Sequence, residues 1–279
     1  LGTDPDSDRV GVVVKDNRGK YIILNGNQTA ALLIYYLLTK WHEKGKIKGK
    51  EYIVKTIVTT DLLTEIAKKY HIEHYDVLTG FKYIADVIKH FEGRKEFIGG
   101  GEESYGYLAG EFVRDKDAIM SCCLIAEAAA WARDRGLTLY DLLLRIYVEF
   151  GFFKELLIST ERKGKEGAEE IALMMKNFRQ NPPVMINNSK VVEIIDYLDE
   201  TSLEKANRKN GEIKIPASDV LQFFTADGSK ISVRPSGTEP KIKFYFGVRE
   251  KLKHIDDYSR VNELLEDRIQ NIIQDLKIR

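Results

Sequence analysis

The sequence predicts an α/β protein of two domains. Between residues 51 and 100, β-rich runs alternate with runs whose apolar residues recur at helical spacing, which indicates a parallel or mixed sheet covered by helices. After Gly151, strand-like runs follow one another between separate helices, which favours a second domain of the α+β type. A hydrophobic content of 43% over 279 residues is ample for a buried core.

The first predicted element is a hairpin. Two β-rich runs at 10–15 and 20–24 flank residues 16–19, in which Gly19 suits a turn position with positive φ. Helical spacing then predicts a helix over 27–42, which the Gly-Lys repeats end. The alternating elements that follow are a strand over 51–60, a helix over 61–71 with Asp61 as candidate cap, a strand over 72–78, a helix over 79–91 and a strand over 95–100.

Helices close the first domain, and strands dominate the second. Gly136, a usual residue for a helix end, separates two of the predicted helices, and a third ends before Pro182 and Pro183. The predicted helices are 117–135, 138–150, 166–179 and 256–277. The predicted strands are 190–198, 219–227, 229–237 and 241–248.

Charge and cysteine content limit the classes of partner. Lys plus Arg equals Asp plus Glu at 43 each, so we expect no nucleic-acid partner. The two cysteines, Cys122 and Cys123, are adjacent and cannot easily bridge each other, which indicates a reducing compartment and a cytoplasmic location. Charges break every apolar stretch well short of the roughly 20 residues of a membrane span, so we expect no membrane partner.

An acidic loop, DPDSDR, stands at the start of the chain. Asp4, Asp6 and Asp8 lie within five residues, so a tight loop can direct all three carboxylates at one hard cation. A calcium loop of the EF-hand type requires Gly at its sixth position and Glu at its twelfth, where this sequence has Arg9 and Lys15. Two interpretations remain: a magnesium-type site, or an acidic turn that leads into a strand.

A glycine-rich loop, GGGEESYG, follows the strand predicted at 95–100. Glu102, Glu103 and Ser104 offer acceptors and a hydroxyl suited to sugar hydroxyl groups, so the loop could bind a polyol. The alternative is an ordinary turn with solvated glutamates. Just beyond it, Arg114 and Lys116 could meet an anionic substrate or could flank a helix start.

The third loop, SVRPSGTEPKIKFYF, joins two predicted strands and suits a phosphate group. Backbone N–H groups at Gly237, two hydroxyls and the Arg234 guanidinium fit a phosphate dianion. The sequence contains no GxxxxGK[ST] motif, so nucleoside triphosphate chemistry is not indicated. A plain hairpin connection is the alternative, and it would leave Arg234, Ser236, Thr238 and Lys241 converging by accident.

Taken in this order, DPDSDR, GGGEESYG with RDKD, and RPSGTEPKIKFY resemble the motifs of the α-D-phosphohexomutase superfamily, and within it the phosphoglucomutase/phosphomannomutase group. The resemblance covers the whole chain and implies a mixed α/β/α domain 3 of the phosphohexomutase type, followed by an α+β (TATA-box-binding-protein-like) C-terminal domain. It makes residues 1–24 a remnant of domain 2 with the metal-binding loop, 25–150 the sugar-binding domain 3, and 151–279 the phosphate-binding domain 4.

The resemblance also implies roles for single residues. Asp4, Asp6 and Asp8 would be Mg²⁺ ligands together with a phosphoserine oxygen, and Arg9 would be the catalytic cation that stabilises charge on the transferring group. The implied substrate-binding residues fall into four groups: Glu102 and Ser104 on sugar hydroxyls; Thr79 and Gly80 in a further sugar-facing turn; Lys116 facing the substrate; and Arg234, Ser236, Gly237 and Thr238 on the phosphate that is not transferred.

By resemblance, the full-length protein would move a phosphoryl group between C1 and C6 of a hexose through a phosphoserine and a bisphosphate. The implied cofactors are Mg²⁺ and hexose 1,6-bisphosphate, and the implied partners are a hexose phosphate and the N-terminal domains of the same protein. The sequence contains no Ser-His-Asn motif of the kind that carries the phosphoserine. We therefore expect this chain to have no turnover alone. The alternative is a non-catalytic phosphosugar-binding module.

Overall fold

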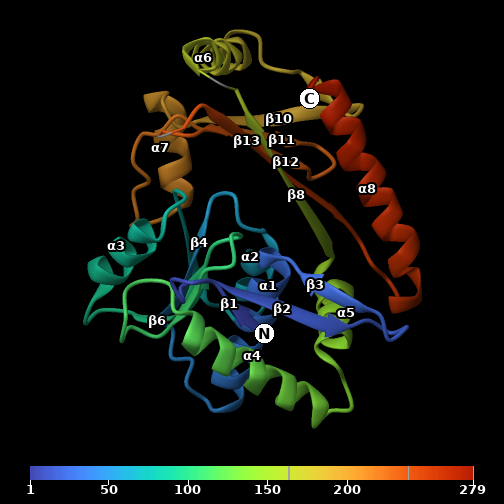
Figure 1. Cartoon of the computed structure of the whole chain (residues 1–279). Coiled ribbons are helices and arrows are strands. Elements are labelled where there is room, and N and C mark those ends of the chain that lie inside the picture. The colour runs from blue at the N-terminus through green and yellow to red at the C-terminus, as the bar shows by residue number, and fades with distance from the viewer. Residues whose placement is uncertain (163, 238, 279) are drawn as a thin grey trace. The chain divides into compact units, whose positions relative to one another are not determined.

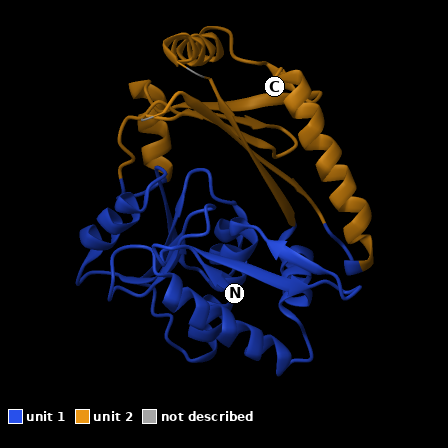
Figure 2. Ribbon diagram, in the orientation of Figure 1, with its two compact units in different colours: residues 1–151, 210–213, 252–255 blue, residues 152–209, 214–251, 256–279 orange. Residues whose placement is uncertain are grey.

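The chain forms two compact units in a computed structural model that describes residues 1–162, 164–237 and 239–278 (Figures 1 and 2). Unit 1 comprises residues 1–151 with the short segments 210–213 and 252–255. Unit 2 comprises residues 152–209, 214–251 and 256–279. The division between the two units therefore falls after Gly151.

Unit 1 begins with a small antiparallel sheet. Its strands lie in the order β1-β2-β3, and β2 pairs with β3 through Val12 and Leu24. The predicted hairpin is confirmed, with Gly19 at φ +79° and the Asp16 carboxylate accepting a bond from the Lys20 N–H at 2.8 Å. The bounds are Gly2–Thr3 for β1, Val10–Lys15 for β2 and Tyr21–Leu24 for β3.

The main sheet of unit 1 is mixed, as predicted. Its order is β5-β4-β6-β7, in which β4 runs parallel to β5 and β6, and β7 is antiparallel to β6. The chain crosses from β4 to β5 through α2 in one direction along the sheet, and from β5 to β6 through α3 in the other direction. Because such connections are right-handed, the two helices lie on opposite faces of the sheet (Figure 1). The bounds are α1 Gly26–Glu43, β4 Glu51–Thr56, α2 Leu62–Lys69, β5 Glu73–Val77, α3 Phe81–Phe91, β6 Glu96–Gly101, β7 Tyr107–Ala109, α4 Ala118–Arg133 and α5 Leu139–Phe150.

Asp61 stands at the predicted N-cap position of α2, but it does not cap the helix through its side chain. Its carboxylate instead accepts a 2.9 Å bond from the Nζ of Lys55. Lys55 is fully buried and also pairs with Asp76 at 3.1 Å, and the pKa of its ammonium is raised: burial lowers it, and the two carboxylates more than compensate. A buried ammonium needs charged partners, and this need outweighs the cap.

Unit 2 is built on one antiparallel sheet with the order β8-β13-β12-β11-β10-β9. Its core is aromatic, since Phe178 of α6 packs on Phe223 and Phe244 of the sheet. The long helix α8 contacts β8 and β13. The bounds are β8 Phe152–Glu161, α6 Gly164–Gln180, β9 Met185–Ile186, β10 Ser189–Asp196, α7 Glu200–Lys209, β11 Leu221–Thr225, β12 Lys230–Pro235, β13 Lys241–Glu250, a 3₁₀ turn Ile255–Asp257 and α8 Tyr258–Asp275.

Helix α7 was not predicted. It follows β10, where the expected strand over 190–198 ends at Asp196. Among its residues only Ala206 is buried, so the sequence shows almost no apolar stripe from which helical spacing could be recognised. Here a helix forms with little hydrophobic pattern to indicate it.

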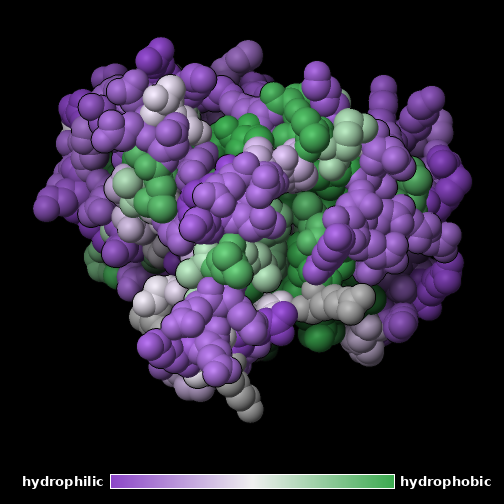
Figure 3. All heavy atoms as spheres, turned by 90° about the horizontal axis from the view of Figure 1, so that it is seen from above, coloured by the Kyte–Doolittle hydropathy of each residue, from purple (hydrophilic) through white to green (hydrophobic). Residues whose placement is uncertain are grey.

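Unit 2 also exposes apolar side chains. The face in Figure 3 shows apolar groups gathered among hydrophilic ones. Large hydrophobic residues of unit 2 with half or more of their surface exposed are Leu173, Val184, Met185, Val192 and Leu198. In the part of the chain that the structure describes, no helix combines the length and apolar character needed to cross a membrane.

Candidate functional site

Two loops that carry predicted site residues follow β5 and β6, the two strands that flank β4 and run parallel to it. Thr79 and Gly80 come after β5, and Glu102 and Ser104 come after β6. The chain moves from β4 to β5 on one side and then to β6 on the other side of β4, so the connection reverses at this strand. Ligands bind at the carboxyl ends of strands at such a switch point. The topology therefore brings the two predicted sugar-facing loops to the carboxyl-end side of the sheet.

Glu102 links these loops directly. Its Oε1 accepts a 2.7 Å hydrogen bond from the Gly80 N–H, and its side chain is 8% exposed. Gly80 lies at φ +119°, a backbone conformation that favours glycine. The structure thus unites Thr79-Gly80 and Glu102, which lie 22 residues apart in sequence.

The sequence placed Glu103 among the possible acceptors of a polyol-binding loop, whereas the family resemblance gave it no role. Its Oε2 accepts bonds of 3.2 Å from the hydroxyls of Thr56, the last residue of β4, and of Thr59, three residues further on. Burial raises the pKa of its carboxyl group, and the charge of Glu102 adds to the rise. The two adjacent glutamates therefore differ: Glu102 holds the turn after β5, and Glu103 anchors the loop to β4. Nothing in the letters GEES distinguishes them.

The loop 102–106 also contacts helix α1 and the acidic loop. A Cβ at Gly26, the first residue of α1, would lie 1.8 Å from the Glu103 carbonyl oxygen, so only glycine allows this close approach. The Tyr105 carbonyl accepts a 3.1 Å bond from the Val10 N–H. Ser104 is half-buried within this frame. The loop thus connects the segment behind the acidic cluster to the sugar-facing edge.

The acidic loop is a tight turn organised by Asp4. Its Oδ1 accepts bonds of 3.2 Å from the N–H groups of Asp8 and Arg9. Desolvation would raise the pKa of Asp4, but the hydrogen bonds from Arg9 and Asp8 outweigh it and lower the pKa. Asp6 is exposed, and Arg9 is mostly exposed with its Nε 3.8 Å from Asp8. The loop is closed by the backbone and not by convergence of the three carboxylates.

The acidic loop fits a divalent cation in part. Within the described ranges, no group of three His, Cys, Asp or Glu side chains is arranged to hold a metal. The carboxylates of Asp4 and Asp8 are close enough to interact, however, and the buried Oδ1 of Asp8 has no hydrogen-bond partner among the described residues. A buried carboxylate oxygen without a donor suits a cation such as Mg²⁺, which takes oxygen ligands.

Lys116 lies against this loop. Its Nζ is 3.2 Å from Asp8 Oδ2 and 3.0 Å from Asp115 Oδ1, and its side chain is only 14% exposed. Burial would lower the pKa of Lys116, but the hydrogen bonds that its ammonium donates to these carboxylates outweigh that effect and raise the pKa. Arg114, the other candidate cation of this segment, pairs instead with Glu92 at 2.5 Å. The structure therefore brings Lys116 to Asp8 and directs Arg114 elsewhere.

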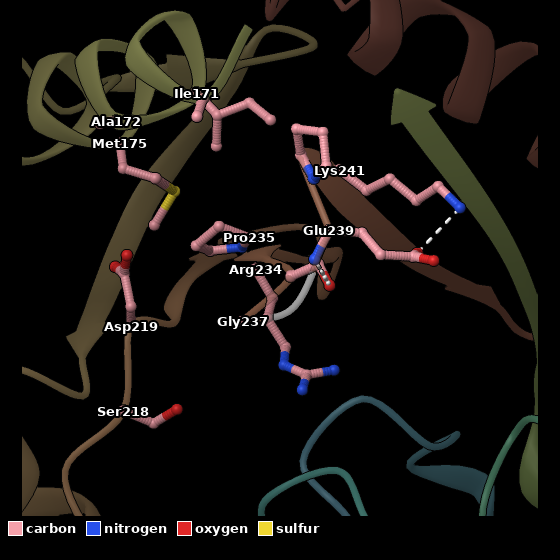
Figure 4. A pocket seen from close by; sticks show the side chains of 13 residues that line it. Ile171, Ala172, Met175, Ser218, Asp219, Arg234, Pro235, Gly237, Glu239 and Lys241 are labelled. Carbon is pink, nitrogen blue, oxygen red and sulfur yellow. Dashed lines mark hydrogen bonds and ion pairs between the residues drawn. The ribbon is translucent and has the colours of Figure 1, made fainter. Parts of the chain in front are cut away.

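The predicted phosphate loop lies in unit 2 and lines a cavity of about 400 Å³. Figure 4 shows apolar side chains of α6, among them Ile171 and Met175, on one side of it. Arg234, Ser236 and Gly237 belong to its wall, whereas Thr238 lies outside the described residues. Three of the four predicted residues thus share one concave surface.

The charges of this loop are arranged unequally. Lys241 pairs with Glu239 at 2.9 Å, whereas the guanidinium of Arg234 points away from α6 in Figure 4 and has no ion pair with any residue that the structure describes. Arg234 faces Lys243 directly across β12 and β13, so both side chains stand on the same face of the sheet. Lys243 was missed as a candidate, because its neighbourhood becomes apparent only from the strand register.

Comparison with known proteins gives the class to which this fold belongs. Residues 25–150 match the family model described as phosphoglucomutase/phosphomannomutase, alpha/beta/alpha domain III, and residues 187–260 match that described as the C-terminal domain. The class is therefore an α/β/α domain followed by an α+β C-terminal domain. The chain belongs to the phosphoglucomutase/phosphomannomutase family.

Relatives include phosphoglucomutases of Staphylococcus haemolyticus, 36% identical over 94% of this chain, and Staphylococcus aureus strain MSSA476, 36% identical over 95%. The chain spans 46% and 47% of their lengths, about half. One solved structure with a similar fold is the exocytosis-sensitive phosphoprotein pp63/parafusin (phosphoglucomutase) from Paramecium, with a TM-score of 0.62 and 19% sequence identity. The match covers 97% of this chain and 45% of that one. A phosphoglucomutase/phosphomannomutase family protein from Burkholderia thailandensis has a TM-score of 0.58 and 15% identity over 99% and 46%.

Proposed function

We propose that this chain supplies the sugar-binding and phosphate-binding domains of a Mg²⁺-dependent phosphohexomutase that interconverts hexose 1-phosphate and hexose 6-phosphate. The observation that carries the proposal is the cavity of about 400 Å³ whose wall includes Arg234, Ser236 and Gly237. A guanidinium without an ion pair among the described residues, beside a hydroxyl and an exposed backbone, suits a phosphate dianion. The sugar would be held in unit 1 by hydrogen bonds to Glu102 and Ser104.

The chain's own residues would divide the work. The acceptors after β5 and β6 would orient the hexose hydroxyls, and the loop after β12 would hold the phosphate that is not transferred. Asp4, Asp6 and Asp8 would hold Mg²⁺, which neutralises charge on a transferring phosphoryl group when bound, and Arg9 would stabilise the same charge. Recognition through hydroxyls and phosphate charge allows a hexose 1,6-bisphosphate to bind in either orientation.

A titration of glucose 1-phosphate against the chain, followed by calorimetry, tests the phosphate loop. The Arg234→Ala variant should bind at least about tenfold more weakly, since it loses a charge-assisted contact. Arg208→Ala is the matched control, because Arg208 is exposed on α7 and pairs with Glu204 at 3.4 Å. Equal affinities for the wild-type chain and Arg234→Ala would remove the phosphate-loop assignment.

We further propose that phosphoryl transfer uses a serine outside these 279 residues, because the sequence contains no Ser-His-Asn motif. The chain alone, given glucose 1-phosphate, the bisphosphate and Mg²⁺, should form no glucose 6-phosphate above blank. The product of the complete open reading frame should form it. Saturable turnover by the chain alone would contradict this proposal. A cytoplasmic location is also proposed, supported by the free thiols of Cys122 and Cys123.

A further inference from the structure

Lys116 occupies a constrained position between two loops of unit 1. A Cβ at Gly106 would lie 2.3 Å from the Cδ of Lys116, so the aliphatic part of Lys116 lies directly on the Gly106 backbone. Its Nζ also stands 5.3 Å from the centroid of the Phe81 ring. The stem is therefore held by packing, and the ammonium group is the part of this side chain that can change partners.

The partner of interest is Asp8. Asp8 Oδ2 pairs with the Lys116 ammonium at 3.2 Å, while the buried Oδ1 has no hydrogen-bond partner among the described residues. The neighbouring Asp4 carboxylate interacts with Asp8 and adds a second acidic group to the loop. The Lys116 ammonium, together with the Arg9 Nε at 3.8 Å from Asp8 Oδ1, thus balances part of the charge of two adjacent carboxylates, the role that a divalent cation would fill more completely.

We propose that Lys116 is the internal counter-cation of the acidic loop, which a divalent metal ion displaces from Asp8. The inference rests on the proposed function, because it takes the acidic loop to be the metal site. Two cations at one carboxylate repel each other, so metal binding weakens the Lys116–Asp8 ion pair, and the ion pair weakens metal binding. Metal binding then frees the ammonium for an anionic substrate, and by linkage the substrate favours metal binding.

The direction of the effect distinguishes this role from that of a mere surface charge. If Lys116 competes with the metal ion, its removal should tighten metal binding, although the loop loses a contact. Lys116→Met keeps an unbranched apolar stem over Gly106 and removes the ammonium. Arg114→Met is the matched control: it removes one positive charge from the same segment, where Arg114 pairs with Glu92 and not with Asp8.

The test is Mn²⁺ binding by the chain, followed by electron paramagnetic resonance. We expect Lys116→Met to bind Mn²⁺ about tenfold more tightly than wild type, the equivalent of one charge-assisted hydrogen bond, and Arg114→Met to stay within about twofold. Equal affinities for Lys116→Met and wild type overturn the inference, as does an equal gain in both variants, because that gain would reflect net charge alone. Absence of Mn²⁺ binding by wild type and Lys116→Met alike also overturns it.

A second measurement needs no variant. The rate of acylation of each lysine by an amine-reactive ester can be followed by mass spectrometry with and without Mg²⁺. We expect Mg²⁺ to raise the rate at Lys116 severalfold and to leave Lys82 of α3 unchanged, and an unchanged rate at Lys116 overturns the inference. Wild-type chain that binds glucose 1-phosphate through Arg234, yet shows neither effect at Lys116, would overturn this inference and leave the proposed function standing.

Discussion

The loops 102–106 and 234–241 are both predicted to hold parts of one substrate, and they are built in contrasting ways. In unit 1, Glu102, Glu103 and Tyr105 each bond to a different segment of the chain. In unit 2, the Arg234 guanidinium has no ion pair with any described residue, and Gly237 is exposed. The first loop is fixed by its own hydrogen bonds, and the second presents a charge.

The difference follows from what each loop would recognise. A sugar hydroxyl forms the same kinds of hydrogen bond as water, so a site that selects it must hold its acceptors in fixed positions. Hydrogen bonds within the protein provide that rigidity. A phosphate dianion is attracted by charge over several ångströms and tolerates a less constrained partner. We therefore expect substitutions in the first loop to change stability, and substitutions in the second to change binding.

The largest expected effect is the loss of stability on substitution of Gly26, with Gly237 as the comparison. Gly26→Ala would put a Cβ 1.8 Å from the Glu103 carbonyl oxygen and force backbone apart, so we expect it to lower the free energy of unfolding by about 3 kcal/mol. Gly237→Ala meets no atom within 4 Å and should change it by less than about 0.5 kcal/mol. Urea denaturation of both variants measures this, and similar losses would remove the contrast between the loops.

The second effect concerns the anchor under Glu103. Thr59→Val removes one of the two hydroxyls that donate to the buried carboxylate, so we expect a loss of about 2 kcal/mol in the free energy of unfolding. The same change at the exposed Thr201 of α7 is the matched control and should cost less than about 0.5 kcal/mol. If thermal unfolding shows equal midpoints for the two variants, Glu103 is not an anchor of the loop.

The sequence was informative where chemistry is local. The hairpin at 10–24, the mixed sheet and the motif that contains Arg234 follow from turn residues, alternation and residue type, because these act over a few neighbouring positions. Helix α7 was missed because a polar helix leaves no apolar stripe. The helix was missed because it buries very little apolar surface.

The roles of Asp61, Glu103 and Lys243 depend on contacts with other parts of the fold. Asp61 pairs with a buried lysine, Glu103 meets two threonines about 45 residues earlier, and Lys243 adjoins Arg234 through the strand register. Helical or strand periodicity carries no information on such pairings, because tertiary contacts decide them. The letters predict which residue types are present, and the fold decides which of them act on one another.

Two glutamates of unit 1, Glu103 and Glu51, should give pH effects of opposite sign. Burial raises the pKa of Glu103, so the wild-type chain loses stability as pH rises through that value, and Glu103→Gln should be relatively more stable at about pH 8 than at about pH 4. Burial also acts to raise the pKa of Glu51, but backbone N–H groups at 48–50 outweigh it and lower the pKa. Its contribution is therefore present at neutral pH and is lost as pH falls through the lowered value.

Glu51→Gln should accordingly lower the free energy of unfolding most at about pH 8 and least in acid, the reverse of Glu103→Gln. Urea midpoints of both variants and the wild type at the two pH values give the comparison. Parallel pH dependence of the two variants would mean that the surroundings of Glu103 do not disfavour its charge. In that case the charged form of Glu103 would hold the first loop. Charge would then be important in both loops, and the contrast between them would be lost.

The smallest expected effect is on the stability of unit 2. Arg234→Ala removes a guanidinium that lacks an ion pair among the described residues and that stands opposite Lys243, and like charges directly across two strands repel. The free energy of unfolding should therefore change by less than about 0.5 kcal/mol, with a slight gain at low salt that disappears at about 1 M salt as screening removes the repulsion. Chemical denaturation at both salt concentrations measures it. A loss above about 1 kcal/mol would mean that the guanidinium serves the fold, and a side chain so engaged would not be available to receive a phosphate.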